Sequence, residues 1–408
     1  ARPPRAPGAG GRWRELTARA SAQDRGQHGR PREDRSSDQP PPRGSVEGAD
    51  VLTAGQHRLT TLAGSGRNTT RANRAVRTTM CVDERRTWVR STNVQSKREE
   101  WEPALSESAP LLSPLRYPGS KRALAPLVGQ CLEANHLRPS LYVEPFSGGA
   151  SVALWLLSKD LVEDVILSDR DPLITSFWRS VFFDTEWLTQ QVRAMEVSLE
   201  RWKTIKRSTP ETVRDQALAC LFLNRTSFSG ILQDRAGPLG GYQQLSPYKI
   251  DCRFPRETLV ARIEAIAEYR TRVRGVWNLG WEDCISEAAA QAAHSPSSSD
   301  GMFLYLDPPF FRKAEHLYRF WFGASDHVKL RDALLEMEHS WLLSYDSAEQ
   351  IELLYGESIR KAVNGTQRKH VELLYSTATI STRKRATEVL ISNLEVLPRF
   401  DAGSPDGL

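Results

Sequence analysis

Short blocks of apolar and polar residues alternate from about residue 114 to residue 397, and large apolar side chains are sparse before that point. Apolar blocks rich in β-favouring residues end at turn-forming residues, and segments with the three- and four-residue apolar spacing of a helix lie between many of them. The predicted strands are residues 141–144, 165–169, 273–279, 304–306, 341–345, 371–377 and 388–394. Such alternation is typical of an α/β fold with a mostly parallel sheet.

Helices are predicted from the same spacing. One begins near Ala123 with Pro126 in its first turn, where proline is tolerated. Residues 178–205 are predicted to form one amphipathic helix that packs into the core or between domains, on the spacing of Leu188, Val192, Met195 and Leu199. The other predicted helices are residues 152–157, 216–222, 258–269 and 326–338, and the Ala- and Ser-rich residues 288–300 are predicted to be a linker.

Residues 1–110 are dominated by Arg, Pro, Gly, Ser, Asp and Gln. They have too few large apolar side chains to offset the entropy of ordering, so we predict that they are disordered, like the tail at 399–408. Two roles stay open for the long segment: a basic arm that holds DNA phosphates, or a dispensable tail. The first methionine is Met80, so translation beginning there is a third reading of this region.

Charge and cysteine content narrow the class of protein. A net charge of +5 permits a polyanionic partner without requiring one. Five cysteines are scattered without a CxxC pair, which argues against a zinc site and against a disulfide framework and favours the reducing cytoplasm. No stretch approaches the roughly 20 apolar residues of a membrane span, so we expect no membrane partner.

The most informative stretch is residues 304–310, where an apolar strand stops at Asp307, Pro308, Pro309 and Phe310. Two prolines cannot extend a strand, so Asp307 is predicted at the carboxyl end of a strand, the edge at which open α/β sheets bind ligands. A carboxylate, a carbonyl and an aromatic ring suit a planar amine, because the oxygens accept its N–H groups and Phe310 stacks on its ring.

Residues 141–151 predict a strand, a tight turn and a helix, with Glu144 before the turn and Gly148 and Gly149 within it. The GxGxxG fingerprint of dinucleotide sites is absent, and Glu144 would repel a pyrophosphate, so the loop favours a cationic ligand. Asp169 ends the next strand, where an acid binds the hydroxyls of a ribose. Lys121, beside a helix start, favours an anion.

Taken in this order, these motifs resemble those of amino-group DNA methyltransferases, in the Dam-like, D12 class of adenine-N6 enzymes, over residues 114–397. The resemblance implies a Rossmann-like methyltransferase domain of seven mostly parallel strands at 111–185 and 270–398. It implies S-adenosylmethionine as cofactor and a helical target-recognition insertion at 186–269. The residues that match the family's cofactor-binding positions are Tyr117, Gly119, Lys121, Glu144, Pro145, Phe146, Gly148, Gly149, Asp169, Arg170, Asp283 and Asp307.

Two of these matches carry a qualification. Asp171, next to the ribose acid and Arg170, replaces the family's usual Asn. Asp283 matches the position that accepts the cofactor's adenine amine, although the adjacent Glu282 is an alternative.

A long polar excursion begins at Asn224 and contains a Gly-rich stretch, which usually marks a functional insertion. Asn, Arg, Gln and aromatic side chains read base edges, fill gaps in a duplex and hold phosphates, and the alternative is an ordinary surface loop. Residues 224–230 resemble the stretch that opens the family's target-recognition region, with Ser229 in place of an Asn. The candidate DNA-binding residues are Asn224, Arg225, Phe228, Ser229, Arg312 and Lys313, the last two being either phosphate contacts or solvated charges.

The resemblance implies methyl transfer to N6 of adenine in double-stranded DNA, with the base flipped out and held by Asp307, Pro308, Pro309 and Phe310. The alternatives are a cytosine-N4 or RNA methyltransferase of the same fold and a DNA-binding relative that no longer turns over. We also expect a cytoplasmic enzyme without a metal ion, a monomer or weak dimer, with a cognate restriction nuclease as a further candidate partner. The sequence does not give the recognition site.

Overall fold

A computed structural model describes residues 111–117, 119–293, 301–311, 314–356, 367–374 and 385–398. The predicted disordered segments, Met80, Arg312, Lys313 and residues 381–384 lie outside these ranges. All described residues belong to one compact unit of the chain.

One sheet organises the fold, with strand order β3-β2-β1-β4-β5-β7-β6. Its strands are β1 (Leu141–Glu144), β2 (Asp164–Ser168), β3 (Val273–Trp277), β4 (Met302–Leu306), β5 (Ser340–Asp346), β6 (Gln367–Leu374) and β7 (Arg385–Ser392). The neighbouring strands β3, β2, β1, β4 and β5 are all parallel to one another. Strand β7 runs antiparallel to both β5 and β6. The prediction of an α/β fold with a mostly parallel sheet is confirmed.

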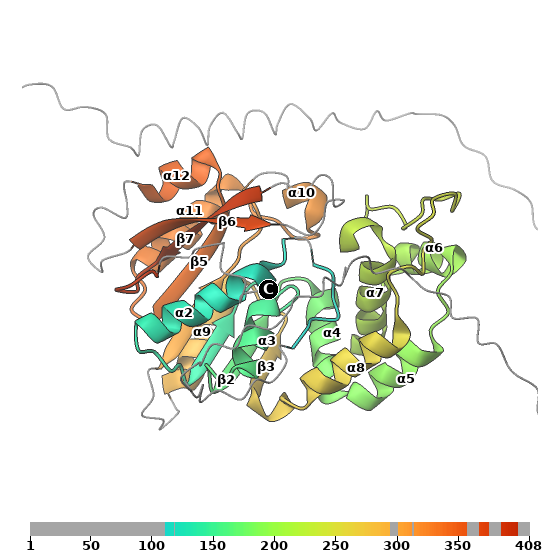
Figure 1. The fold of residues 1–408 in the computed structure, drawn as a ribbon, viewed down its shortest axis with the longest axis horizontal. Coiled ribbons are helices and arrows are strands. Elements are labelled where there is room, and N and C mark those ends of the chain that lie inside the picture. Colours follow the sequence, from blue (N-terminus) through green and yellow to red (C-terminus); the bar gives the residue numbers. More distant parts are fainter. Residues whose placement is uncertain are drawn as a thin grey trace, which may run out of the picture. The chain divides into compact units, whose positions relative to one another are not determined.

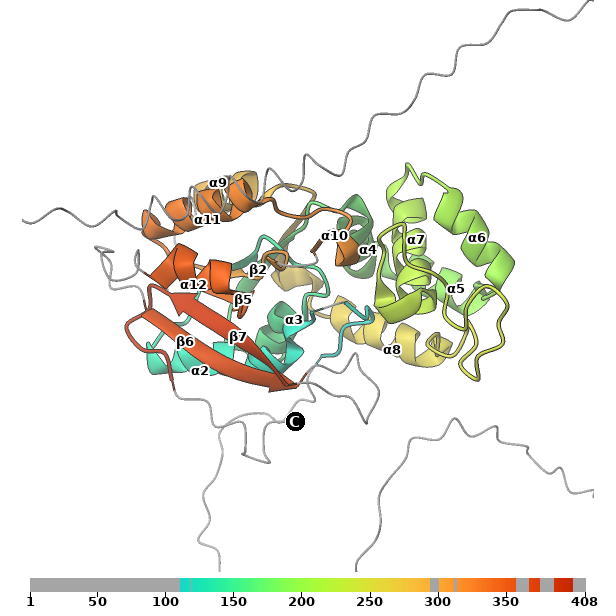
Figure 2. The same cartoon turned by 90° about the horizontal axis from the view of Figure 1, so that it is seen from above.

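Helices cover both faces of this sheet, so the central strands are buried on both sides, as parallel strands require (Figure 2). One face packs against α2 (Ala125–Ala134), α3 (Ser151–Ser158) and α4 (Pro172–Phe183). The other packs against α9 (Trp281–Ala293), α11 (Ala324–Leu335) and α12 (Glu349–Gly356). The strand order reverses between β1 and β4, and ligands bind at such a switch point in open α/β sheets.

The predicted helix over 178–205 is wrong as a single element. The chain forms α4, then α5 (Thr185–Ala194), then α6 (Leu199–Arg207). The first break falls at Asp184, and the second follows Met195, which has an extended backbone. Ser198 then starts α6, because its hydroxyl accepts the Arg201 N–H as an N-cap. The apolar spacing correctly marked buried residues but did not reveal these interruptions.

Helices between β2 and β3 gather on one side of the fold (Figure 1). After α6 come α7 (Val213–Thr226), the 3₁₀ turn η2 (Phe228–Gly230), α8 (Arg256–Ala267) and η3 (Arg270–Arg272). The helix predicted at 216–222 therefore extends through Asn224 and Arg225. Because α4 packs against both α7 and α8, this helical group shares a core with the sheet domain.

The remaining elements are η1 (Lys121–Leu124) before α2, and α10 (Ala314–Leu317) after β4. The linker predicted at 288–300 is wrong for its first part, because residues up to Ala293 continue α9, with Ala288 buried. Alanine is a strong helix former, and the prediction of a linker gave that helix preference too little weight. No helix in the described ranges has both the length and the apolar content needed to cross a membrane.

Candidate active site

Three acids from separate motifs line one cavity of about 330 Å³ at the switch point of the sheet. Glu144 ends β1, Asp169 follows β2 and Asp307 follows β4, so parallel pairing brings their carboxylates to the same edge. This is the juxtaposition on which the sequence reading depended. In the described part of the chain no cluster of His, Cys, Asp and Glu is suited to hold a metal ion.

Asp307 is held at the cavity by neighbouring strands and by η1. Its Oδ1 accepts hydrogen bonds from Lys121 Nζ at 2.7 Å and from the Ser344 hydroxyl on β5 at 3.1 Å. Ser344 is itself hydrogen-bonded to the Tyr305 hydroxyl. The side chain of Asp307 keeps 24% of its surface exposed, whereas Lys121 keeps 3%. Asp307 is thus fixed in direction yet reachable from the cavity.

Burial and charge oppose each other at this pair. Burial alone would lower the pKa of Lys121, but Asp307 and Glu388 outweigh it and raise that pKa, so the ammonium stays charged. Burial raises the pKa of Asp307, and the Lys121 ammonium counters that rise. We conclude that an ion pair sits where the target amine is expected to bind.

The turn after Asp307 places Pro309 on the cavity wall, whereas Pro308 and Phe310 are not among the described residues that line the cavity. Pro308 is buried. The Phe310 ring lies 5.1 Å from Lys121 Nζ and 5.9 Å from the Tyr318 ring. Gly119 has φ +74°, and a Cβ there would come within 2.7 Å of the Phe310 ring. Glycine is therefore required for the approach of these two loops.

Glu144 is buried, and its Oε1 accepts the Tyr142 hydroxyl at 2.7 Å and the Ala153 N–H at 2.9 Å. Burial raises the pKa of Glu144 to about 8, against the effect of these hydrogen bonds. A cationic ligand would favour the ionised carboxylate and reverse that rise. The carboxyl group is therefore suited to such a ligand.

The glycine turn after Glu144 brings backbone against an aromatic ring. Gly148 has φ +42°, and a Cβ at this position would come within 2.6 Å of the Tyr117 ring. Its N–H donates to Asp169 Oδ2 at 2.9 Å, and its carbonyl accepts from Trp178 Nε1. Phe146 also lines the cavity and is in edge contact with Phe322. The turn thus joins Tyr117 and Asp169 at the cavity.

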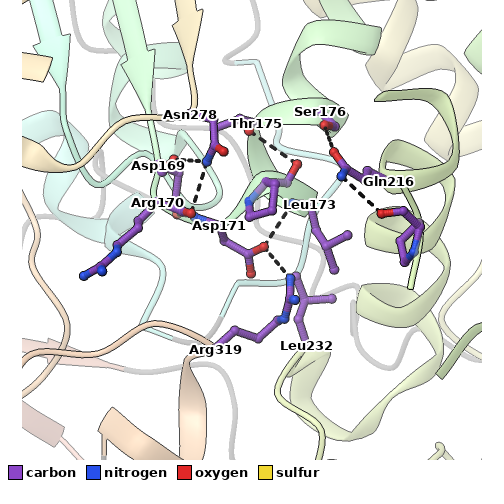
Figure 3. Close-up of polar contacts among 12 residues, drawn as sticks. Asp169, Arg170, Asp171, Leu173, Thr175, Ser176, Gln216, Leu232, Asn278 and Arg319 are labelled. Carbon is purple, nitrogen blue, oxygen red and sulfur yellow. Dashed lines mark hydrogen bonds and ion pairs between the residues drawn. The ribbon is translucent and has the colours of Figure 1, made fainter. Parts of the chain in front are cut away.

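Asp169 is fixed by backbone donors on both oxygens, since Oδ1 accepts the Asp171 N–H at 2.8 Å (Figure 3). Asn278 supports the same turn by donating to the carbonyls of Asp169 and Arg170. Burial, with the nearby charge of Asp171, raises the pKa of Asp169 to about 7. An acid held in this way is a directed acceptor for hydroxyl groups.

Asp171 caps α4, and its Oδ1 accepts the Leu173 N–H at 3.0 Å and pairs with Arg319 Nη1 at 2.6 Å (Figure 3). Asp171, which stands where the family usually has Asn, thus forms an ion pair with an arginine from the segment after α10. Arg319 was missed in the sequence, because nothing near Asp171 in the chain marks its partner.

Four aromatic side chains that sequence reasoning missed also line the cavity: Tyr318, Phe320, Trp321 and Phe322. Arg170 lies 5.7 Å from the Phe320 ring, within the range of a cation–π contact. The density of aromatic residues so soon after Asp307 was the signal that could have found them.

Eleven of the twelve residues predicted to bind the cofactor line this single cavity, all except Gly119, which contacts its wall. Asp283 and Glu282 both line it, so the cavity does not separate the two alternatives. The family model for the D12 class of N6 adenine-specific DNA methyltransferases matches residues 117–377, more than half of the chain. The chain belongs to this family. It is an adenine-specific DNA methyltransferase.

Other comparisons add little to this D12 enzyme. A comparison with curated proteins gave no match. One solved structure, described as a precorrin 8w decarboxylase from Methanobacterium thermoautotrophicum, has 10% sequence identity. The alignment covers 68% of this chain and 91% of that protein's chain. The TM-score of 0.29 is too low to support a conclusion about fold or function.

The residues predicted to bind DNA in this D12 enzyme fall into two groups. A direct DNA contact by Asn224 does not fit the structure, because its side chain is fully buried. Its Oδ1 accepts the Arg116 N–H at 2.7 Å, and its Nδ2 donates to the carbonyls of Arg116 and Gly230. We therefore reassign Asn224 to positioning: it ties the end of α7 to the loop that carries Tyr117.

Phe228 and Ser229 differ from Asn224. Phe228 is 64% exposed. Three other large apolar residues that follow it in the chain are also mostly exposed: Tyr242, Leu245 and Tyr248. Ser229 has φ +55°, in the left-handed region that disfavours serine. Gly230 must be glycine, because a Cβ would stand 2.0 Å from the Arg116 carbonyl oxygen. The loop is thus anchored at Gly230 and exposes an aromatic ring just before it.

Arg225 is buried among other arginines. Burial, together with the charges of Arg116, Arg262 and Arg253, lowers its pKa to about 9. Arg225 Nε and Arg116 Nη1 are buried without a hydrogen-bond partner in the described part of the chain. The repulsion between these cations and their unpaired N–H donors would both be relieved by a bound anion.

Proposed function

We propose that this D12 methyltransferase moves a methyl group from S-adenosylmethionine to N6 of an adenine that is flipped out of double-stranded DNA. The single observation that carries the proposal is the meeting of Glu144, Asp169 and Asp307 at one cavity. Glu144 is buried and the other two are half-buried; the pKa of each is raised, and a cationic ligand lowers the cost of ionising such groups.

The cofactor's properties fit the residues on the cavity wall. Its ammonium and sulfonium charges suit Glu144 and its neighbours, and its ribose hydroxyls suit Asp169, whose oxygens are already directed by backbone N–H groups. When bound, it supplies a methyl group on a positively charged sulfur. Tyr117, packed against Gly148, lines the same cavity and would shield a bound cofactor from solvent.

The target amine is a weak nucleophile because its lone pair is delocalised into the adenine ring. Asp307 and the Pro308 carbonyl would accept its two N–H groups, and this localises the lone pair and aims it into the cavity. Phe310 offers a face on which the flipped base stacks, at a cost of unstacking of about a few kcal/mol that contacts in the pocket offset.

The helical group between β2 and β3 is proposed to hold the DNA. Phe228 is the exposed ring that would fill the gap left by the flipped base. The arginines around Arg225 would meet phosphates, which relieves their mutual repulsion. Arg312 and Lys313 remain predicted phosphate contacts, and a restriction nuclease and a monomeric or weakly dimeric state remain predictions from the sequence.

The test is to incubate the protein with mixed-sequence DNA and S-adenosylmethionine and to map modified bases at single-base resolution. We expect N6-methyladenine at a defined sequence and no N4-methylcytosine. Parallel incubation with RNA of the same sequences separates the RNA alternative. Modification of cytosine, or of RNA in preference to DNA, would contradict the proposal.

A further inference from the structure

The Lys121 ammonium contacts the carboxylate of Asp307 that is proposed to accept the target amine. Lys121 Nζ lies 2.7 Å from Asp307 Oδ1 and 5.1 Å from the Phe310 ring, the two groups that are to receive the target amine and its ring. It also donates to the Gly119 carbonyl at 3.0 Å. Both Lys121 and Ser344 contact Oδ1, so Oδ2 remains to accept an N–H of the amine, but a cation on Oδ1 withdraws negative charge from the whole carboxylate and makes it a weaker acceptor.

Glu388 on β7 provides that partner. Its side chain is 1% exposed, and its Oε1 lies 3.9 Å from Lys121 Nζ. Its Oε2 is buried without a hydrogen-bond partner in the described part of the chain. A buried carboxylate in this state carries a large desolvation cost that closer contact with an ammonium reduces. A small displacement of Lys121 toward β7 would stabilise the Glu388 carboxylate and leave more negative charge on Asp307, which then accepts the amine N–H more strongly.

Charge counting supports the same role. Asp307 and Lys121 alone form a neutral pair, whereas Glu388 leaves the group with a net negative charge. The amine nitrogen gains positive charge as its lone pair enters a new bond, and a nearby negative charge stabilises that change. Among the described residues, Asp346 is the other acid in this neighbourhood, paired with Glu388 across the β5–β7 ladder, and its Oδ1 accepts the Phe311 N–H.

The pKa directions agree with this arrangement. Burial raises the pKa of Glu388 to about 7; Lys121 counters that rise, and Asp307 and Asp346 add to it. Moving the ammonium closer would lower that pKa and keep Glu388 ionised.

We propose that Glu388 is a positioning residue that draws Lys121 away from Asp307 when the target amine binds. The inference rests on the proposed methylation of adenine, but neither the motifs in the sequence nor the family match assigns a role to Glu388. Its position in β7, far along the chain from Asp307, explains why the motifs did not mark it.

The experiment compares wild type with Glu388→Gln and Glu388→Asp in single-turnover methyl transfer, on a duplex that contains the mapped adenine. We expect Glu388→Gln, which has nearly the same shape but no charge, to slow transfer by about 10- to 100-fold, a smaller loss than removal of a direct contact would give. Dissociation constants for the cofactor and the duplex should change by less than about threefold, since Glu388 contacts neither. Glu388→Asp, which keeps the charge, should recover part of the rate.

A double-mutant cycle with Lys121→Met tests whether Glu388 acts through the ammonium. In the Lys121→Met background, Glu388→Gln should have little further effect on the rate. Equal losses in both backgrounds, or a Glu388→Gln rate within about twofold of wild type, would overturn the inference. Thermal unfolding of each variant checks folding, and if Glu388→Gln does not fold, Glu388→Asp carries the same cycle. If wild type itself forms no N6-methyladenine, the proposed function fails before Glu388 is tested.

Discussion

Like charges are gathered in two regions of this methyltransferase, acids in one and arginines in the other. The cavity at the edge of the sheet gathers Glu144, Asp169 and Asp307, whose pKa values burial raises. The end of α7 gathers arginines around Arg225, whose pKa burial and its neighbours lower. Each region is costly when empty and is relieved by a ligand of opposite charge. Under the proposed function, the comparison teaches that the cationic cofactor and the anionic DNA are received at separate places in the fold.

The sharpest way to break this comparison is to neutralise the acid cavity. Glu144→Gln should weaken binding of S-adenosylmethionine by about 100-fold, because truncating a buried charged partner costs about 2–5 kcal/mol. Affinity for DNA should stay nearly unchanged. Calorimetric titration with the cofactor measures the effect, and Glu163→Gln, at an exposed position, is the matched control. Equal cofactor affinity in Glu144→Gln and wild type would show that Glu144 does not receive the positive charge of the cofactor.

The reciprocal change neutralises the arginine cluster. Arg253→Gln, at the exposed arginine of the cluster, should weaken DNA binding by about tenfold and reduce the slope of log affinity against log salt by about one, as loss of one phosphate contact does. Cofactor affinity should stay the same, and the free energy of unfolding should not fall, because removing the Arg253 charge relieves its repulsion of Arg225. Fluorescence anisotropy at several salt concentrations measures it, with Arg207→Gln as an exposed control. Unchanged DNA affinity and salt slope would contradict the assignment.

The pH dependence sharpens the cavity side. The pKa of Glu144 rises from 4.5 to about 8 in the folded protein, and that of Asp169 from 3.8 to about 7. Between these values the folded state binds more protons than the unfolded state, so the stability of the free protein should fall as pH rises toward 8. Cofactor affinity should rise over the same range, because the cation favours the ionised carboxylates.

Thermal unfolding with and without S-adenosylmethionine, followed from pH 5 to pH 8.5, checks both signs. Stabilisation by the cofactor that shrinks as pH rises would show that these carboxyl groups do not receive its charge.

The smallest expected effect comes from Asp171→Asn, which restores the family's usual residue. The amide oxygen can still cap α4, but the ion pair with Arg319 is lost. We expect a loss of about 1 kcal/mol in the free energy of unfolding, since the pair is partly exposed. Chemical denaturation measures it. Arg319→Gln should cost a similar amount, and the double variant should cost no more than either single change; additive losses would mean that the pair does not act as a unit.

How much the sequence could predict differs between the two regions. Glu144 is the last residue of a short β-strand, and Asp169 and Asp307 each directly follow one, so the local pattern placed them at one edge of a parallel sheet. The partners Arg319 and Glu388 could not be found in this way, because they meet the site only through tertiary contact from distant segments. The apolar spacing over 178–205 marked buried positions correctly but did not show that Asp184 and Ser198 divide the helix.

Asn224 shows the same limit on the DNA side. The motif identified its importance, but a sequence does not reveal which way a polar side chain points. In the folded protein Asn224 bonds to the backbone of Arg116 and Gly230 rather than facing solvent.

The most direct test of the central claim is single-turnover transfer of labelled methyl groups to the mapped adenine by wild type and by Asp307→Ala. Asp332→Ala, at an exposed position on α11, serves as control. We expect Asp307→Ala to lose at least about 100-fold in rate when the protein is folded and saturated with cofactor. Some loss of cofactor affinity and of thermal stability is expected too, because Asp307 lines the cavity and pairs with the buried Lys121. Transfer by Asp307→Ala at the wild-type rate would contradict the account.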